Sequence, residues 1–138
     1  MHTFHHQRLI PTTPAAVFDA FRDPTRLARW WGPAGFSNRF ETFEFEVGGQ
    51  WVFDMIGPDG TVYPNASTFT QIEPDRQVTV RHVCAPFFAL SVTLEAAPGG
   101  TLVRWAQTFD DAAVAAAIAH IVEPANEQNL ERLAAELG

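Results

Sequence analysis

Lysine is absent from this sequence, and its nine basic residues are all arginine. Sixteen Asp and Glu residues outnumber them, which gives a formal net charge of −7 at pH 7. Binding to nucleic acid requires clustered basic side chains that neutralise phosphates, and attraction to anionic membranes requires basic clusters too. The composition therefore argues against nucleic acid and against an anionic membrane surface as partners.

Cysteine occurs once, at Cys84, so the chain cannot form an internal disulfide. No signal-peptide pattern and no apolar run long enough to cross a membrane is present. These absences predict a cytoplasmic protein without membrane insertion. A length of 138 residues with 46% hydrophobic residues is enough to bury a core in one domain, which we expect to span residues 1–138.

Motifs of catalysis and metal binding are also lacking. No Ser-His-Asp order, pair of carboxylates at a defined spacing or phosphate-binding loop appears. His2, His5 and His6 lie close together, but nothing downstream completes a set of metal ligands. Cys84 has no partner base evident in the sequence, so it is not expected to act as a nucleophile. The sequence predicts neither a metal nor a cofactor.

Aromatic residues other than tyrosine are abundant, with twelve Phe and four Trp against one Tyr. The stretch 43–60 shows how they are used: Phe43, Phe45 and Val47 alternate with glutamates, and Trp51, Phe53 and Met55 alternate with other residues. Alternation of this kind predicts two strands that share an aromatic face, joined by a tight turn at Gly48-Gly49. Such a face requires a covering element.

The rest of the chain can be divided by its turn and cap residues. A first strand is expected over residues 2–10, and two short helices follow at Thr12-Thr13-Pro14 and Asp23-Pro24. Short connections then predict an antiparallel meander. The expected strands are 36–47, 50–56, 61–72, 77–83, 88–96 and 101–109. Their expected inward residues are Val78, Val80, His82, Leu90, Val92, Leu94, Val103, Trp105, Gln107 and Phe109.

The last predicted element is a helix over residues 111–137, capped by Asp110 or Asp111 and bent at Pro124. Its expected buried stripe contains Val114, Ile118, Ile121 and Ala125 before the bend and moves to Leu130, Leu133 and Leu137 after it. The helical period also places Asn126 and Asn129 near the inner face. Six alanines make its first half small on all sides. A small helix face laid over an aromatic sheet either comes very close or leaves a gap, and a gap would be a binding site.

The whole chain resembles the helix-grip fold of the START and birch-pollen-allergen (SRPBCC) superfamily. Within it, the chain is similar to the family named after the C-terminal domain of the heat-shock-protein-90 ATPase activator. The resemblance rests on five segments: Pro14-Ala15-Ala16-Val17-Phe18-Asp19-Ala20-Phe21, Asp23-Pro24, Arg29-Trp30-Trp31-Gly32-Pro33, Val47-Gly48-Gly49-Gln50-Trp51-Val52-Phe53, and Leu130-Glu131-Arg132-Leu133. It implies an α+β fold in which a curved antiparallel sheet of six or seven strands wraps around the long C-terminal helix.

The resemblance also implies a cavity between sheet and helix that takes a small hydrophobic or aromatic molecule. The residues expected to line it are Trp30, Trp31, Trp51, Phe53, Met55, Phe69, His82, Trp105, Gln107, Ile121 and Asn126. The chain departs from the family pattern at Ala125-Asn126, where relatives commonly carry Gly-Trp, and at Gln107, where they often have His. The alternative interpretation is ordinary packing, in which the rings are core and the polar groups bond to one another or to water.

Two other functions stay open at this point. A cyclase-type enzyme could use His82 as an acid-base catalyst, and a chaperone-activating module would bind a protein partner. The acidic composition argues against the second. A homodimer also stays open, because Phe40 or Phe88 on an outer sheet face would favour one.

Overall fold

The computed structural model describes all residues 1–138 and contains ten elements. The strands are β1 (His2–Ile10), β2 (Ser37–Phe43), β3 (Gln50–Ile56), β4 (Val62–Glu73), β5 (Gln77–His82), β6 (Phe88–Ala97) and β7 (Gly100–Phe109). The helices are α1 (Pro14–Arg22), α2 (Pro24–Trp30) and α3 (Ala112–Leu137). The predicted order of strand, two short helices, six strands and a long helix is confirmed.

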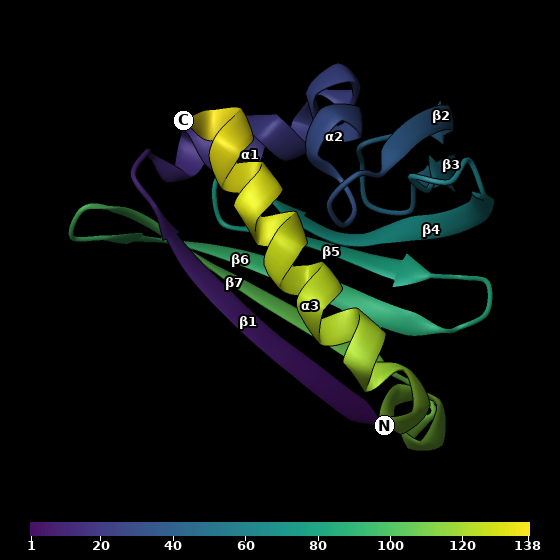
Figure 1. Cartoon of the computed structure of the whole chain (residues 1–138). Coiled ribbons are helices and arrows are strands. Elements are labelled where there is room, and N and C mark those ends of the chain that lie inside the picture. Colours follow the sequence, from purple (N-terminus) through teal and green to yellow (C-terminus); the bar gives the residue numbers. More distant parts are fainter.

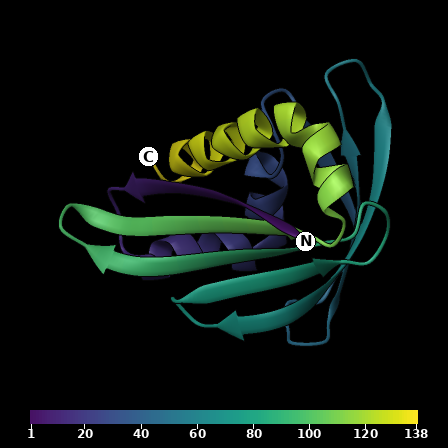
Figure 2. The same ribbon diagram turned by 90° about the horizontal axis from the view of Figure 1, so that it is seen from below.

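The seven strands form one antiparallel sheet in the order β1-β7-β6-β5-β4-β3-β2. Consecutive strands from β2 to β7 are neighbours, as short connections require. β1 lies at the far edge of the sheet and pairs with β7, so the first and the last strand of the chain are neighbours. Figures 1 and 2 show the sheet curving around α3, which crosses one face diagonally, with α1 and α2 near its C-terminal end. This is the α+β helix-grip arrangement that the sequence predicted.

The concave face of the sheet carries the aromatic residues. Two β-bulges adjust which side chains reach it, because a bulge adds one residue to a strand and shifts its alternation. The bulge in β2 between Phe40 and Thr42 lets Phe40 and Phe43 stack on each other, with ring centroids 5.7 Å apart. Phe40 and Phe88 both pack against inward-facing core residues. Neither ring lies on an outer face of the sheet, so these two residues no longer favour a homodimer.

The predicted Gly48-Gly49 hairpin is wrong in its details. β2 ends at Phe43, and a loop of six residues leads to β3. The reason is pairing with a third strand: Gly48 N–H donates to the Phe69 carbonyl at 2.7 Å, and Phe69 N–H donates to the Gly49 carbonyl at 3.0 Å. The loop therefore folds back onto β4 instead of closing the β2–β3 hairpin tightly, and Val47 is exposed.

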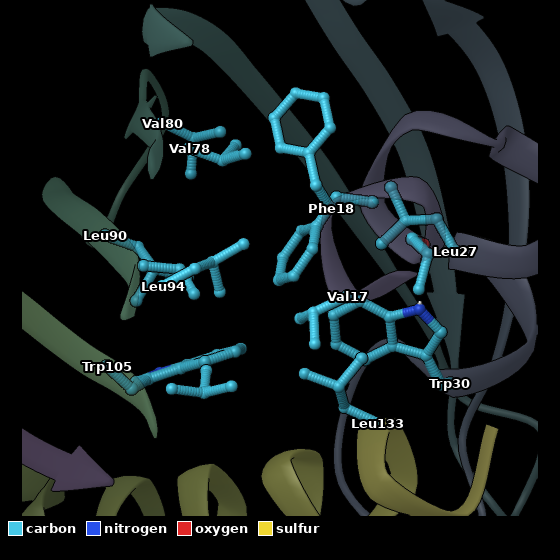
Figure 3. Close-up of a cluster of buried hydrophobic side chains, with 14 of the residues drawn as sticks. Val17, Phe18, Leu27, Trp30, Val78, Val80, Leu90, Leu94, Trp105 and Leu133 are labelled. Atoms are coloured by element: carbon cyan, nitrogen blue, oxygen red, sulfur yellow. Dashed lines mark hydrogen bonds between the residues drawn. The ribbon is translucent and has the colours of Figure 1, made fainter. Parts of the chain in front are cut away.

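The short helices begin where their cap residues predict. Thr13 Oγ1 accepts from Ala16 N–H at 3.2 Å, and Asp23 Oδ1 accepts from Thr25 N–H at 3.0 Å. Each helix alone is too short to be stable, so packing must hold it. Figure 3 shows Val17, Phe18, Leu27 and Trp30 of α1 and α2 projecting towards side chains of the sheet, with Leu133 of α3 beside them. A buried cluster of 19 residues joins both helices, α3 and the sheet.

α3 is capped by Asp111, whose carboxylate accepts from Ala113 N–H at 2.8 Å. The buried face predicted for the first half of this helix is wrong, whereas Leu130 and Leu133 are buried as predicted. Ile121 is 60% exposed and Val114 is exposed, whereas Ala115, Asn126, Asn129, Leu130 and Leu133 are buried. In the first half of α3 the true face lies one residue further along the chain. Apolar side chains surround the first half of α3, so hydrophobic contrast could not reveal which side meets the sheet.

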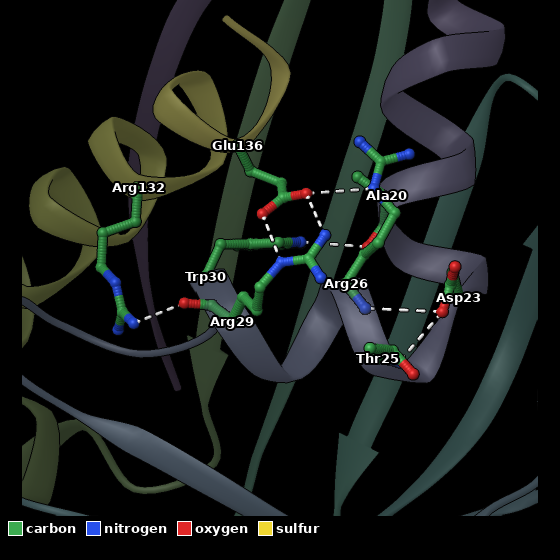
Figure 4. Close-up of polar contacts among 8 residues, drawn as sticks. All are labelled: Ala20, Asp23, Thr25, Arg26, Arg29, Trp30, Arg132 and Glu136. Carbon is green, nitrogen blue, oxygen red and sulfur yellow. Dashed lines mark hydrogen bonds and ion pairs between the residues drawn. The ribbon is translucent and has the colours of Figure 1, made fainter.

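The C-terminal end of α3 is tied to α2 by ionic contacts (Figure 4). Glu136 accepts hydrogen bonds from Arg29 Nε at 3.0 Å, Arg29 Nη2 at 2.8 Å and Arg26 Nε at 3.1 Å. These bonds, the one from Arg29 first, hold the pKa of the Glu136 carboxyl below its ordinary value. The same contact raises the pKa of Arg29.

We expect Glu136→Gln to remove a pH-dependent part of the stability. Because the pKa of Glu136 is lowered on folding, its contribution is complete above the unfolded value of about 4.3 and is lost as pH falls through the folded value. Urea unfolding at several pH values should therefore show that the wild type has the larger free energy of unfolding. This difference from the variant should be largest near neutral pH and disappear in acid. Glu131→Gln, at an exposed position of the same helix, is the control. A gap that stays constant from neutral to acidic pH would contradict this assignment.

A candidate ligand cavity beneath the long helix

A cavity of about 140 Å³ lies under the middle of α3. Its walls come from β3 to β7, from the segment that follows α2, and from one turn of α3. Nine of its seventeen lining residues are hydrophobic, and none is Asp, Glu, Lys or Arg. The lining residues are Trp31, Gly32, Pro33, Trp51, Phe53, Met55, Asn65, Ser67, Val80, His82, Phe88, Leu90, Trp105, Gln107, Ala125, Asn126 and Asn129.

Aromatic rings form one wall of this cavity. Trp31 lies edge-on against Trp51, with centroids 4.9 Å apart, and is tilted against Trp105 at 5.6 Å. Phe53 stacks on Trp51 at 4.4 Å. Offset and edge-on rings of this kind pack favourably against each other. The wall is therefore rigid as well as apolar, and it presents the flat or edge surfaces that suit a planar molecule.

Three amide side chains form the polar end. Asn126 Nδ2 donates to Gln107 Oε1 at 3.0 Å, and Asn129 Nδ2 donates to the Trp30 carbonyl at 3.1 Å. Asn126 and Asn129 are only 8% and 5% exposed. Each amide has two N–H donors and an oxygen that can accept, so one bond leaves most of its capacity unused. The polar end thus has free donors and free acceptors inside a mostly apolar space.

His82, 5% exposed, lies in the wall with its ring stacked on Phe88 at 4.4 Å. Its Nδ1 is 2.8 Å from the Pro86 carbonyl, and its Nε2 is 2.9 Å from Asn65 Oδ1. The Cys84 thiol, for which the sequence offered no partner, lies 3.4 Å from the same Nε2. Both ring nitrogens are engaged by the protein, so neither is free to take a proton from a molecule in the cavity.

The segment from Trp31 to Phe36 contributes Trp31, Gly32 and Pro33 to the cavity wall, and Arg132 of α3 holds it in place. Figure 4 shows one bond of Arg132, to the Arg29 carbonyl. Arg132 donates to the carbonyls of Arg29, Trp31, Gly32, Pro33 and Phe36 at 2.7 to 3.0 Å. Burial lowers the pKa of the Arg132 guanidinium, which has no carboxylate partner. The cavity wall is therefore held by one cation that replaces water around five backbone oxygens.

Eight of the eleven residues predicted from sequence line this cavity. They are Trp31, Trp51, Phe53, Met55, His82, Trp105, Gln107 and Asn126. Trp30 instead fills the core, with its indole N–H donating to the Ala20 carbonyl at 3.0 Å. Phe69 lies behind the wall, stacked on Trp51 at 5.9 Å. Ile121 points to solvent because the buried face of α3 is rotated away from it.

Sequence reasoning did not place Asn65, Ser67 and Asn129 in the wall. Ser67 is the register partner of the inward-facing His82 and lies two residues before the inward-facing Phe69, so alternation along β4 could have found it. For Asn129 the helical period did indicate the inner face, but it was not counted among the lining residues. Alternation also places Asn65 on this face, but only the fold shows that it reaches His82.

A larger hollow of about 560 Å³ is lined by nine residues, of which only two are hydrophobic. Most come from the outward positions of β1, β6 and β7, such as His5, Gln7 and Arg104. Apolar area removed from water is the main source of affinity for a small ligand, so the smaller, ring-lined cavity is the better candidate site. No group of three or more His, Cys, Asp or Glu side chains is placed to hold a metal ion. None of the helices is both long and apolar enough to span a membrane.

Comparison with known proteins places the fold. No curated protein matches the sequence. A solution structure of a protein from Arthrobacter aurescens superimposes with a TM-score of 0.89 at 27% identity, covering 98% of this chain and 85% of that one. A crystal structure of a Nitrosomonas europaea protein gives 0.87 at 14% identity, with 98% and 93% covered. The AHSA1 protein of Silicibacter pomeroyi gives 0.77 at 22% identity, with 99% and 97% covered.

The family described as activator of Hsp90 ATPase homolog 1-like protein matches residues 11–138, which is nearly the whole chain. The seven-stranded sheet, the paired short helices and the grip around α3 agree with that match. The chain therefore belongs to the family of activator of Hsp90 ATPase homolog 1-like proteins.

Proposed function

We propose that this protein binds a small, mainly apolar molecule in the cavity beneath α3. The observation that carries the proposal is a ring-lined void of about 140 Å³ whose lining contains no carboxylate, ammonium or guanidinium group. An engineered apolar cavity of about 150 Å³ binds benzene, so the volume is sufficient for a small molecule. Cavities that serve only as packing defects are costly, at about 24 cal/mol per Å³. Binding a ligand offers a reason to retain such a space.

The geometry supports binding better than acid-base catalysis. A general base must reach the proton that it abstracts, and the nitrogens of His82 already face Pro86 and Asn65. No other titratable side chain lines the cavity. Nor does any observation favour a protein partner over a small molecule, although the family takes its description from a chaperone activator.

Ala125→Phe is expected to abolish binding. Ala125 is half-buried in the cavity wall on α3 and makes no side-chain hydrogen bond, so a phenyl ring there would occupy the void without leaving a polar group unpaired. Toluene titrated into the protein and followed by ¹H–¹⁵N NMR should shift amide signals of cavity residues in the wild type only. Ala117→Phe, at an exposed site of the same helix, should bind as the wild type does. Equal toluene shifts in the wild type and in Ala125→Phe would count against this site.

A further inference from the structure

The cavity's size and charge limit what it can hold, and this step rests on the proposed function. A volume of about 140 Å³ is close to the roughly 150 Å³ that accommodates benzene, so one ring fills it and a fused ring system or long acyl chain would extend out of it. An ionised ligand would be desolvated without a counter-charge, which is very costly. The occupant is therefore uncharged and contains a single ring.

The polar end adds a chemical requirement. The bond between Asn126 Nδ2 and Gln107 Oε1 leaves the Asn126 oxygen and the Gln107 amino group without protein partners. The Asn129 oxygen is also unused, because only its Nδ2 bonds to Trp30. In addition, the indole N–H groups of Trp51 and Trp105, two wall residues, have no acceptor. Of these groups, only the two indole N–H groups are fully enclosed without a partner, which buried polar groups normally find, whereas the amide atoms are not enclosed by protein. A bound molecule can pair with those amide atoms.

A hydroxyl is the smallest group that both donates and accepts. It can donate to the oxygen of Asn126 or Asn129 and accept from the Gln107 amino group in one position, which a carbonyl or a methyl cannot do. We propose that the ligand is an uncharged, single-ring aromatic molecule that carries a hydroxyl group, recognised by the Gln107–Asn126 amide pair together with Asn129. Phenols meet this description, since they are uncharged at neutral pH as tyrosine is.

The test compares phenol, toluene, benzoate and 2-naphthol as probes by NMR titration of the full chain. Phenol is expected to bind about tenfold more tightly than toluene, because hydrogen bonds add to the same apolar contact. Benzoate and 2-naphthol should bind more weakly than both, on grounds of charge and size. If toluene binds as tightly as phenol, the hydroxyl assignment is overturned while cavity binding stands. If no probe shifts the amide signals of cavity residues, both the proposed binding function and the hydroxyl assignment fail.

The double variant Gln107→Leu/Asn126→Leu isolates the amide pair. Removing both partners together leaves no broken half-pair, so the change should be mild for folding. Phenol and toluene should then bind with affinities within about twofold of each other. Gln71→Leu, at an exposed amide on β4, should keep the wild-type preference. If the double variant does not fold, NOE spectra of the wild type with phenol bound provide the test. Contacts between phenol protons and the side-chain amide protons of Asn126 and Gln107 are expected, and their absence overturns the assignment.

Discussion

Gly49→Ala is expected to be among the most destabilising single changes in this chain, with a loss of about 3 kcal/mol in the free energy of unfolding. A Cβ at this position would lie 2.1 Å from the Glu44 carbonyl oxygen and 2.9 Å from that of Glu46. Both neighbours are backbone atoms, so no side chain can rotate away. The loop would have to shift, and with it the hydrogen bond between Phe69 N–H and the Gly49 carbonyl.

The adjacent residue provides the matched control. Gly48 has φ +86°, and a Cβ there meets nothing within 4 Å. Gly48→Ala should therefore cost only the strain of a left-handed alanine, about 1 to 2 kcal/mol. Urea unfolding of the two variants separates crowding from backbone strain. Equal midpoints for both would mean that the close approach at Gly49 does not constrain the loop.

Arg132→Met is expected to cost about 2 to 4 kcal/mol and to weaken ligand binding as well. Methionine keeps much of the apolar stem but removes a donor from five backbone carbonyls. Trp31 and Pro33 keep a second donor, from Asn38 Nδ2 and Phe36 N–H. Four of the five carbonyls belong to the segment that carries Trp31, Gly32 and Pro33 into the cavity wall. Loosening it should raise the Kd for toluene, measured in the same titration as before, together with the drop in Tm.

Arg104→Met is the control for this change. Arg104 is more than half exposed and pairs only with Glu95 at 2.6 Å, and exposed pairs of this kind contribute little. Its Tm and its affinity for toluene should stay near the wild-type values. A Tm for Arg132→Met as high as that of Arg104→Met would show that water replaces the guanidinium at no cost.

Most of the fold could be predicted from sequence because the signals were local. Thr13-Pro14 and Asp23-Pro24 fix the starts of α1 and α2, and alternating residues from Val78 to Phe109 mark the inner face correctly. The prediction was wrong where a third element intervened. The Gly48-Gly49 turn pairs with β4, and no reading of β2 and β3 alone could show that.

The candidate site was harder to predict, since its residues depend on how α3 is rotated. Ile121 is the apolar residue that a hydrophobic stripe would select, yet the buried positions are the polar Asn126 and Asn129. Their side chains are held by Gln107 and by the Trp30 carbonyl, contacts that join residues 19 and 99 positions apart. Hydrophobicity could not indicate the turn from Asn126 to Asn129, because the inner contacts of that turn are hydrogen bonds.

α3 is anchored at two separate places. Ala115 packs with Phe4 and Phe109 near its start, and Leu130 and Leu133 enter the main core near its end. Pro124 lies between these anchors, where the helix lacks one backbone bond and bends (Figure 2), and the hydrogen bond from Asn126 to Gln107 follows two residues later. The part of α3 that covers the cavity is thus packed against the sheet on both sides and lacks one backbone hydrogen bond in between. Because α3 is supported on both sides of the cavity, the stretch above it stays clear of the sheet although only Ala125, Asn126 and Asn129 face the space beneath it.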